Sequence, residues 1–165
     1  MSNYVSRMLA LLGPRNPLEV LAETPEALAR AVAGLSVERE AQPEKSGKWS
    51  VRQVVQHLAD SEVVGGFRFR MILAEDGPAI AGYDQDLWAE RLRYQESAVA
   101  DALPEFAALR RINLRVLQRV DPAELERWGM HSERGRETLA HLLRLYAGHD
   151  LAHLRQIERI RSVVG

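Results

Sequence analysis

Residues 50–74, SVRQVVQHLADSEVVGGFRFRMILA, decide the fold class of this chain. Ser50 followed by Gln53 is a capping box, in which each side chain bonds the backbone of the other residue at the start of a helix. No proline interrupts the run until Pro78, where the sequence EDGP ends it. The stretch therefore predicts one long helix over about residues 51–74, which a Gly-Gly pair could interrupt.

Three further helices follow from apolar residues at helical spacing. The first is predicted over 24–35, with Thr24 as N-cap and Pro25 at the first position. The second is predicted from about Ser97 or Asp101 to 120, with Pro104 in its first turn rather than as a kink, and the third over about 137–163. No segment shows the alternation that a sheet needs, and residues 128–135 are expected to form a loop. The pattern predicts an all-α fold, an up-and-down four-helix bundle with a long loop between its second and third helices.

Length and composition limit the classes of protein to which the chain can belong. Its 165 residues suit one domain over 1–165, with a short N-terminal lead over 1–22. The absence of cysteine excludes disulfides, thiolate ligands and a cysteine nucleophile. A net charge of -1 argues against a nucleic-acid partner. Without an apolar run of membrane-spanning length or a signal sequence, we expect no membrane association and a cytoplasmic location.

Two histidines near the C-terminus are spaced for metal binding. His149 and His153 are four residues apart, which places them on one face of the last helix and inside its apolar stripe. Both imidazoles could then reach one ion at about 2.0 to 2.1 Å. The alternative is that they are core histidines satisfied by hydrogen bonds. His131 and His141 lie off this stripe and are expected at the surface or in loops.

His57 is the third candidate ligand. It lies in the middle of the helix over 51–74, on a face that is half apolar and half polar. Such a face can line a cavity, and three neutral imidazoles leave positions on an ion for water or substrate. On spacing alone, an ordinary histidine on the bundle surface fits equally well.

Two segments resemble motifs of the DinB-like superfamily, in particular its YfiT-like, bacillithiol-transferase-like branch. The first is WSVRQVVQHLADS over 49–61 and the second is YAGHDLAH over 146–153; FRFR over 67–70 and HSERG over 131–135 agree with it. The resemblance implies a DinB-like bundle, a homodimer, and a divalent metal, zinc or nickel, held by His57, His149 and His153. The chain departs from near relatives at Glu62 and Gly148, which puts the substrate in doubt more than the metal.

Several members of that superfamily are thiol-dependent transferases that use bacillithiol, mycothiol or glutathione. The resemblance therefore implies a metal-dependent enzyme that transfers a low-molecular-weight thiol to an electrophilic small molecule, in detoxification or stress response. Since the chain has no cysteine, the sulfur must come from a diffusible cosubstrate. The alternatives are a metal-dependent hydrolase of a small substrate and a non-catalytic bundle that binds a metal or ligand.

Four further side chains are candidates for supporting roles. Asp60 and Asp150 lie close in sequence to the histidines and could orient their N–H groups, or could be solvated carboxylates or members of salt bridges. Ser61 and Arg68 are candidates for binding a cosubstrate, and Arg68 lies about 16 Å along the helix from His57. Arg68 could neutralise a carboxylate on a thiol cosubstrate or pair with a buried acid.

Overall fold

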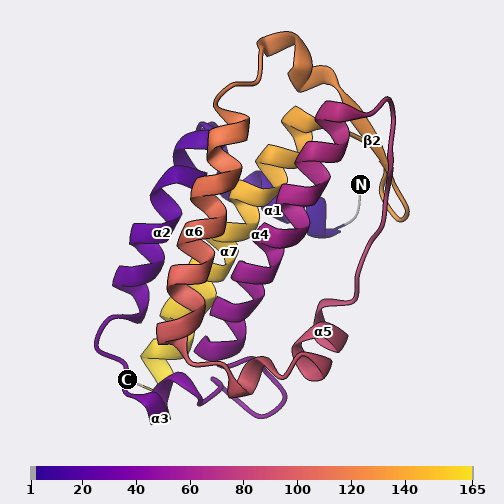
Figure 1. Ribbon diagram of the computed structural model, residues 1–165. Helices are drawn as coiled ribbons and strands as arrows, with labels where there is room; N and C mark the ends of the chain where they lie inside the picture. The colour runs from indigo at the N-terminus through magenta and orange to yellow at the C-terminus, as the bar shows by residue number, and fades with distance from the viewer. Residues whose placement is uncertain (1–2, 165) are drawn as a thin grey trace.

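Four long helices form a bundle, and a fifth packs against the outside of the last one (Figure 1). The structure is a computed structural model that describes residues 3–164. The bundle consists of α2 (Pro17–Val32), α4 (Val51–Ala74), α6 (Val99–Leu117) and α7 (Leu139–Val164), and the fifth helix is α1 (Asn3–Leu12). The predicted helical bundle is confirmed.

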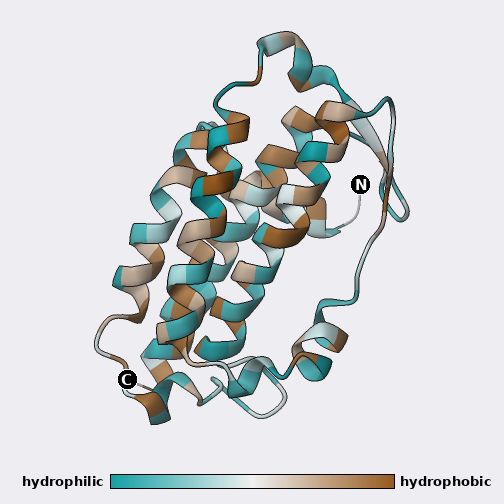
Figure 2. Ribbon diagram, in the orientation of Figure 1, coloured by the Kyte–Doolittle hydropathy of each residue, from teal (hydrophilic) through white to brown (hydrophobic). Residues whose placement is uncertain are grey.

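Shorter elements occupy the connections between the long helices. They are α3 (Val37–Glu40), α5 (Gln85–Arg91), two 3-10 turns, η1 (Tyr94–Glu96) and η2 (Pro122–Glu126), and the strands β1 (Ala79–Ile80), β2 (Trp128–His131) and β3 (Gly135–Thr138). Each long helix mixes apolar and polar residues along its length (Figure 2). The apolar residues of α4 recur at helical spacing and are buried, as Val51, Val54, Val55 and Leu58 show.

Two core clusters, one at each end of the bundle, reveal the directions of the helices. Val54, near the start of α4, shares one cluster with Phe106, in the first half of α6. Ile72, near the end of α4, shares the other with Leu117, at the end of α6. Thus α4 and α6 run parallel, and α2 and α7 run the opposite way (Figure 1).

The prediction of an up-and-down bundle is therefore wrong in the direction of its third helix. In an up-and-down bundle every long helix runs antiparallel to the one before it in the chain. Here the connection over residues 75–98 carries the chain back along the whole of α4, about 36 Å at 1.5 Å per residue, before α6 begins. The long loop was predicted, but its crossing from one end of the bundle to the other was not.

The start of α2 also differs from the prediction. The helix begins at Pro17, with Asn16 as its N-cap, rather than at Thr24. The Asn16 side chain accepts a backbone N–H, and a proline at the first position loses no helical hydrogen bond. Pro25 consequently lies inside the helix, and the Thr24 hydroxyl donates to the carbonyl of Val20 at 2.8 Å instead of capping.

Pro104 lies deeper in its helix than predicted. Because α6 begins at Val99, Pro104 falls in the second turn rather than the first. The carbonyl four residues earlier, on Ala100, can receive no helical hydrogen bond from a proline. Ala100 is exposed, so that carbonyl can bond with water instead.

A small sheet, which the sequence pattern did not predict, covers one end of the bundle. β2 pairs antiparallel with β3, from Trp128 opposite Thr138 to His131 opposite Gly135, and parallel with the two residues of β1. Strands of two to four residues are too short to show alternation. Their pairing joins segments about 50 residues apart, so the expected loop over 128–135 is a hairpin held by a tertiary contact.

The segment 1–22, expected as a lead, contains α1 and the first six residues of α2. α1 packs against α7 where Gly148 lies. A Cβ on Gly148 would lie 2.1 Å from the carbonyl oxygen of Met8, so only glycine lets the two backbones approach this closely. Among the helices described, none is both long and apolar enough to cross a lipid bilayer.

Gly148→Ala should destabilise the protein by about 1–3 kcal/mol, because the new methyl group meets the α1 backbone and cannot be relieved by a rotamer change. In an open helix the same change would stabilise by up to about 1 kcal/mol. Urea unfolding measures the loss of stability. Faster amide hydrogen exchange in residues 3–12 should accompany it, and unchanged stability would contradict the close contact.

Candidate metal centre

Three imidazoles from two helices converge at one point between α4 and α7. His57 lies two turns after the capping box of α4, in which Ser50 and Gln53 bond each other's backbone N–H. The Nε2 atom of His149 lies 2.9 Å from that of His57 and 3.1 Å from that of His153. One nitrogen from each of the three lies within 4.8 Å of the others. The structure thus brings together the three residues selected from the sequence.

Hydrogen bonds alone cannot satisfy this arrangement. Each ring nitrogen is either a donor with one hydrogen or an acceptor with one lone pair. The Nε2 atom of His149 faces two other Nε2 atoms at hydrogen-bond distance, so it can pair fully with only one of them. A cation that accepts the lone pairs of all three nitrogens satisfies each of them. This requirement distinguishes a metal site from a set of core histidines.

Distance and charge also fit a divalent ion. Nitrogens that share one ion at about 2.0–2.1 Å lie roughly 2.9–3.4 Å from one another, close to the separations observed. Burial, together with the neighbouring histidines, keeps the pKa of His57 well below its ordinary value. The same causes lower the pKa of His153 to about 3. Both rings are therefore neutral at pH 7, the form that binds metal.

Asp60 and Asp150 have different surroundings. The Asp60 carboxylate accepts hydrogen bonds from the hydroxyl of Tyr94 at 2.5 Å and from Gln56, and within residues 3–164 it makes none with an imidazole. An orienting role for Asp60 therefore finds no support in this geometry. Asp150 is 1% exposed, and its Oδ1 atom lies 3.8 Å from Nδ1 of His149.

A buried arginine from α6, Arg110, fixes the position of Asp150. Its guanidinium is 2.8 Å from Oδ2 of Asp150 and 2.8 Å from Oε1 of Glu62, and all three side chains are buried. Burial would raise the pKa of Asp150, but Arg110 and His149 outweigh it and hold that pKa below its ordinary value. Two carboxylates and one guanidinium leave a net charge of -1 beside the histidines, and this charge favours a cation there.

Pro25 supplies a further partner for Arg110. As a proline it has no N–H to donate to the carbonyl of Leu21, four residues earlier in α2. The Nη1 group of Arg110 donates to that carbonyl at 2.7 Å. The proline inside α2 thereby frees a buried acceptor for the arginine on α6.

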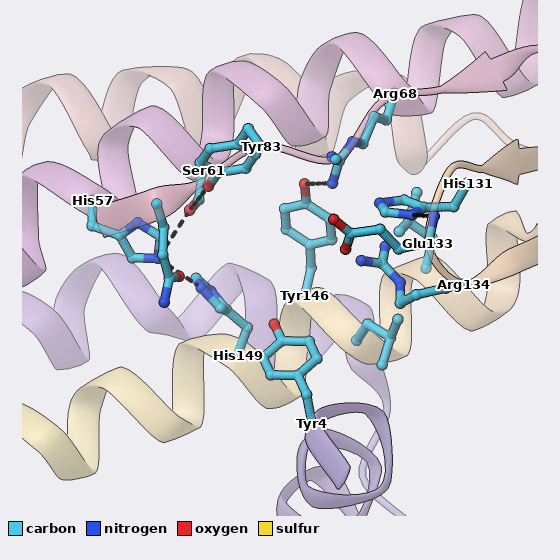
Figure 3. Close-up of a pocket in the computed structure, with 14 residues that line it drawn as sticks. Tyr4, His57, Ser61, Arg68, Tyr83, His131, Glu133, Arg134, Tyr146 and His149 are labelled. Carbon is cyan, nitrogen blue, oxygen red and sulfur yellow. Dashed lines mark hydrogen bonds between the residues drawn. The ribbon is translucent and has the colours of Figure 1, made fainter. Parts of the chain in front are cut away.

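A cavity of about 150 Å³ opens on the histidine cluster. Figure 3 shows His57 and His149 at one end of it, Arg68 and His131 at the other, and Tyr146 between them. Ser61 lies beside the cluster, its hydroxyl 3.4 Å from Nε2 of His57. A wider hollow of about 880 Å³ borders His149 and His153 from another side.

The expectation for His131 is wrong. Expected at the surface or in a loop, His131 instead ends β2, is 2% exposed and lines the cavity. The burial of Arg110 was not predictable for the same reason: the sequence gives no sign of which elements will cover a polar residue. The HSERG segment gave the only hint for His131, through its resemblance to the superfamily. His141, by contrast, lies outside both the cluster and the cavity lining.

The comparison with protein families decides the relationship. The model of the DinB superfamily matches residues 21–157, most of the chain. The chain belongs to the DinB superfamily. The matched range runs from the second turn of α2 into α7 and includes all three histidines of the cluster.

Curated relatives and a solved structure agree with this membership. The chain is 33% identical over 145 residues to a candidate metal-dependent hydrolase of Bacillus mycoides (88% of this chain, 83% of the relative). It is 32% identical over 152 residues to YfiT of Bacillus subtilis, also named as a candidate metal-dependent hydrolase (90% and 84%). The structure of YfiT, described as an unusual four-helix bundle, matches with a TM-score of 0.83 at 30% identity (88% and 84%).

Replacing Arg110 with methionine should cost about 3–5 kcal/mol, because Glu62 and Asp150 would remain as buried carboxylates without a counter-charge. Arg159→Met is the matched control: the arginine of its ion pair with Glu44 is 56% exposed, and the change should cost less than about 1 kcal/mol. Urea unfolding of metal-free protein gives both values. Equal losses for the two variants would contradict the structural importance of the buried cluster.

Proposed function

We propose that this protein is a divalent-metal-dependent hydrolase of a small molecule, with His57, His149 and His153 as the metal ligands. The observation that carries the proposal is the convergence of three imidazole Nε2 atoms at the end of a cavity. The names of the relatives support the reaction class. A divalent ion held there would supply Lewis acidity, which lowers the pKa of a bound nucleophile and polarises the bond under attack.

The surrounding side chains would prepare the site for this chemistry. Asp150, fixed by Arg110, lies next to His149 and would favour the orientation in which Nε2 faces the ion. The hydroxyl groups of Ser61 and Tyr83, 3.4 Å apart, would hydrogen-bond the nucleophile or the substrate. Burial raises the pKa of Tyr83, so it stays a donor at neutral pH.

Thiol transfer is a second candidate, and one feature of the site favours it. Within the described chain the ligand cluster includes no carboxylate, and the side chains that contact its Nε2 atoms are Ser61 and the histidines themselves. The site thus offers no evident general base. A thiol, with a pKa of about 8.5, needs much less activation than water, whose pKa is far higher. The sulfur would come from a cosubstrate, since the chain has no cysteine.

Purified protein should bind one zinc or nickel ion per chain, and His57→Ala and His153→Ala should each abolish this stoichiometric binding. His141→Ala is the matched control, a histidine of the same helix as His153 that lies outside the cluster, and it should bind as the wild type does. Elemental analysis after dialysis gives the stoichiometry. Added metal should also raise the melting temperature of the wild type and of His141→Ala only. Metal content that none of the three changes affects would exclude the site.

The nucleophile is identified by comparing two electrophiles with and without thiols. Metal-dependent cleavage of 4-nitrophenyl acetate at a rate that added thiol does not change would support hydrolysis. Metal-dependent loss of chloride from 1-chloro-2,4-dinitrobenzene that requires glutathione or bacillithiol would support transfer. A protein that binds stoichiometric metal and turns over neither would fit the non-catalytic alternative.

A further inference from the structure

Arg68 is a buried cation without a carboxylate partner. It is 7% exposed, and its guanidinium donates to the carbonyl of Ala81 at 2.6 Å and to the hydroxyl of Tyr146 at 3.5 Å. Neither partner carries a negative charge, and across residues 3–164 no ion pair includes Arg68. Burying an uncompensated charge is costly. Of the two roles open from the sequence, pairing with a buried acid of this chain is therefore excluded within the described residues.

His131 presents an unpaired donor to the same cavity. Its Nδ1 atom accepts the backbone N–H of Glu133 at 3.1 Å, so in the neutral ring the hydrogen is on Nε2. That Nε2 atom is buried and has no hydrogen-bond partner among the residues described. Burial and the nearby Arg134 lower the pKa of His131, which keeps the ring neutral and this tautomer populated.

Two other charged side chains, Glu133 and Arg134, line this end of the cavity. Arg134 is neutralised by Glu137 through two contacts, at 2.6 and 2.8 Å. Figure 3 shows the Glu133 carboxylate in the cavity beside Arg68 and Arg134, but Glu133 is exposed and, among the described residues, makes no ion pair with Arg68. Solvent weakens its field much more than that of a buried group. The buried charge without compensation is thus that of Arg68.

We propose that Arg68 and His131 bind the carboxylate group of a small organic acid in the cavity. The guanidinium and the Nε2–H group are two donors at the cavity end opposite His57 and His149 (Figure 3). A carboxylate has two oxygens, one for each donor, and its bond to an arginine is charge-assisted. The cavity, at about 150 Å³, suits a small acid that extends from these donors toward the histidines.

The subsite gives the proposed reaction its substrate class. A ligand anchored by its carboxylate at Arg68 would present its other end to the three histidines, so a substrate or thiol cosubstrate would be a carboxylic acid. This positioning role rests on the proposed metal-centred function. Binding of the carboxylate does not, because Arg68 and His131 lie outside the histidine cluster.

Metal-free protein, prepared with a chelator, tests the subsite separately from the metal. We expect butyrate to bind saturably in calorimetric titrations, and butyramide, its neutral isostere, with an equal amount of sodium chloride, to bind at least about tenfold more weakly. Arg68→Gln should raise the dissociation constant for butyrate at least about tenfold. His131→Asn, which keeps an acceptor near the Nδ1 position but removes the Nε2–H donor, should raise it severalfold.

Arg70→Gln is the matched control, since it removes the same charge from an exposed position two residues along α4, outside the cavity lining. It should leave butyrate binding unchanged. If Arg68→Gln does not fold, Arg68→Lys is tested instead. It keeps the positive charge but loses the planar set of guanidinium N–H donors, so it should still weaken butyrate binding. Equal binding of butyrate and butyramide, or full binding by Arg68→Gln, would overturn the proposal, as would tighter binding of inorganic phosphate than of butyrate.

The result is distinguishable from that of the metal experiments. Carboxylate binding by metal-free protein together with failure of stoichiometric metal binding would reject the proposed function and keep the subsite. Stoichiometric metal binding and turnover without selectivity for carboxylates would support the proposed function and reject the subsite.

Discussion

The guanidinium of Arg110 joins all four long helices at one point. From α6 it reaches the carbonyl of Leu21 on α2, the carboxylate of Glu62 on α4 and that of Asp150 on α7. A buried group with this many polar partners tolerates little movement, because any shift leaves a charge uncompensated. The relative positions of α4 and α7, and hence of their histidines, depend on this contact.

Other features of the molecule compensate for the free-energy cost of burying the Arg110 guanidinium. Pro25 weakens the ladder of α2 by one hydrogen bond, but the carbonyl that it frees is the one that Arg110 uses. The cluster keeps a net negative charge next to His149, which suits a site for a cation. The same few side chains thus hold the helices together and supply the negative charge beside the histidine cluster.

The parallel arrangement of α4 and α6 has a consequence for the cavity. Their connection, over residues 75–98, must return along the bundle, and on its way it passes the histidine cluster. Tyr83 and the carbonyl of Ala81 come from this connection, and His131 from the hairpin that pairs with β1. An antiparallel pair with a tight turn would leave this side of the histidines without a wall.

The sequence alone determined the ranges of α4 and α7 and the choice of histidines. Capping boxes, apolar spacing and the H-x-x-x-H pattern are local, because a residue three or four positions away is a neighbour on any helix. For this reason the ranges of α4 and α7 and the pairing of His149 with His153 could be predicted.

Tertiary structure decided everything that depends on distant neighbours. His131 and Arg110 are polar residues whose burial follows from elements far away in the chain, and the short strands exist only because they pair. The direction of α6 depends on the path of a connection, which periodicity does not encode. Arg68 shows the division most clearly: the sequence placed it on the same helix as His57, but only the fold shows that it is buried, makes no ion pair within residues 3–164 and faces a cavity.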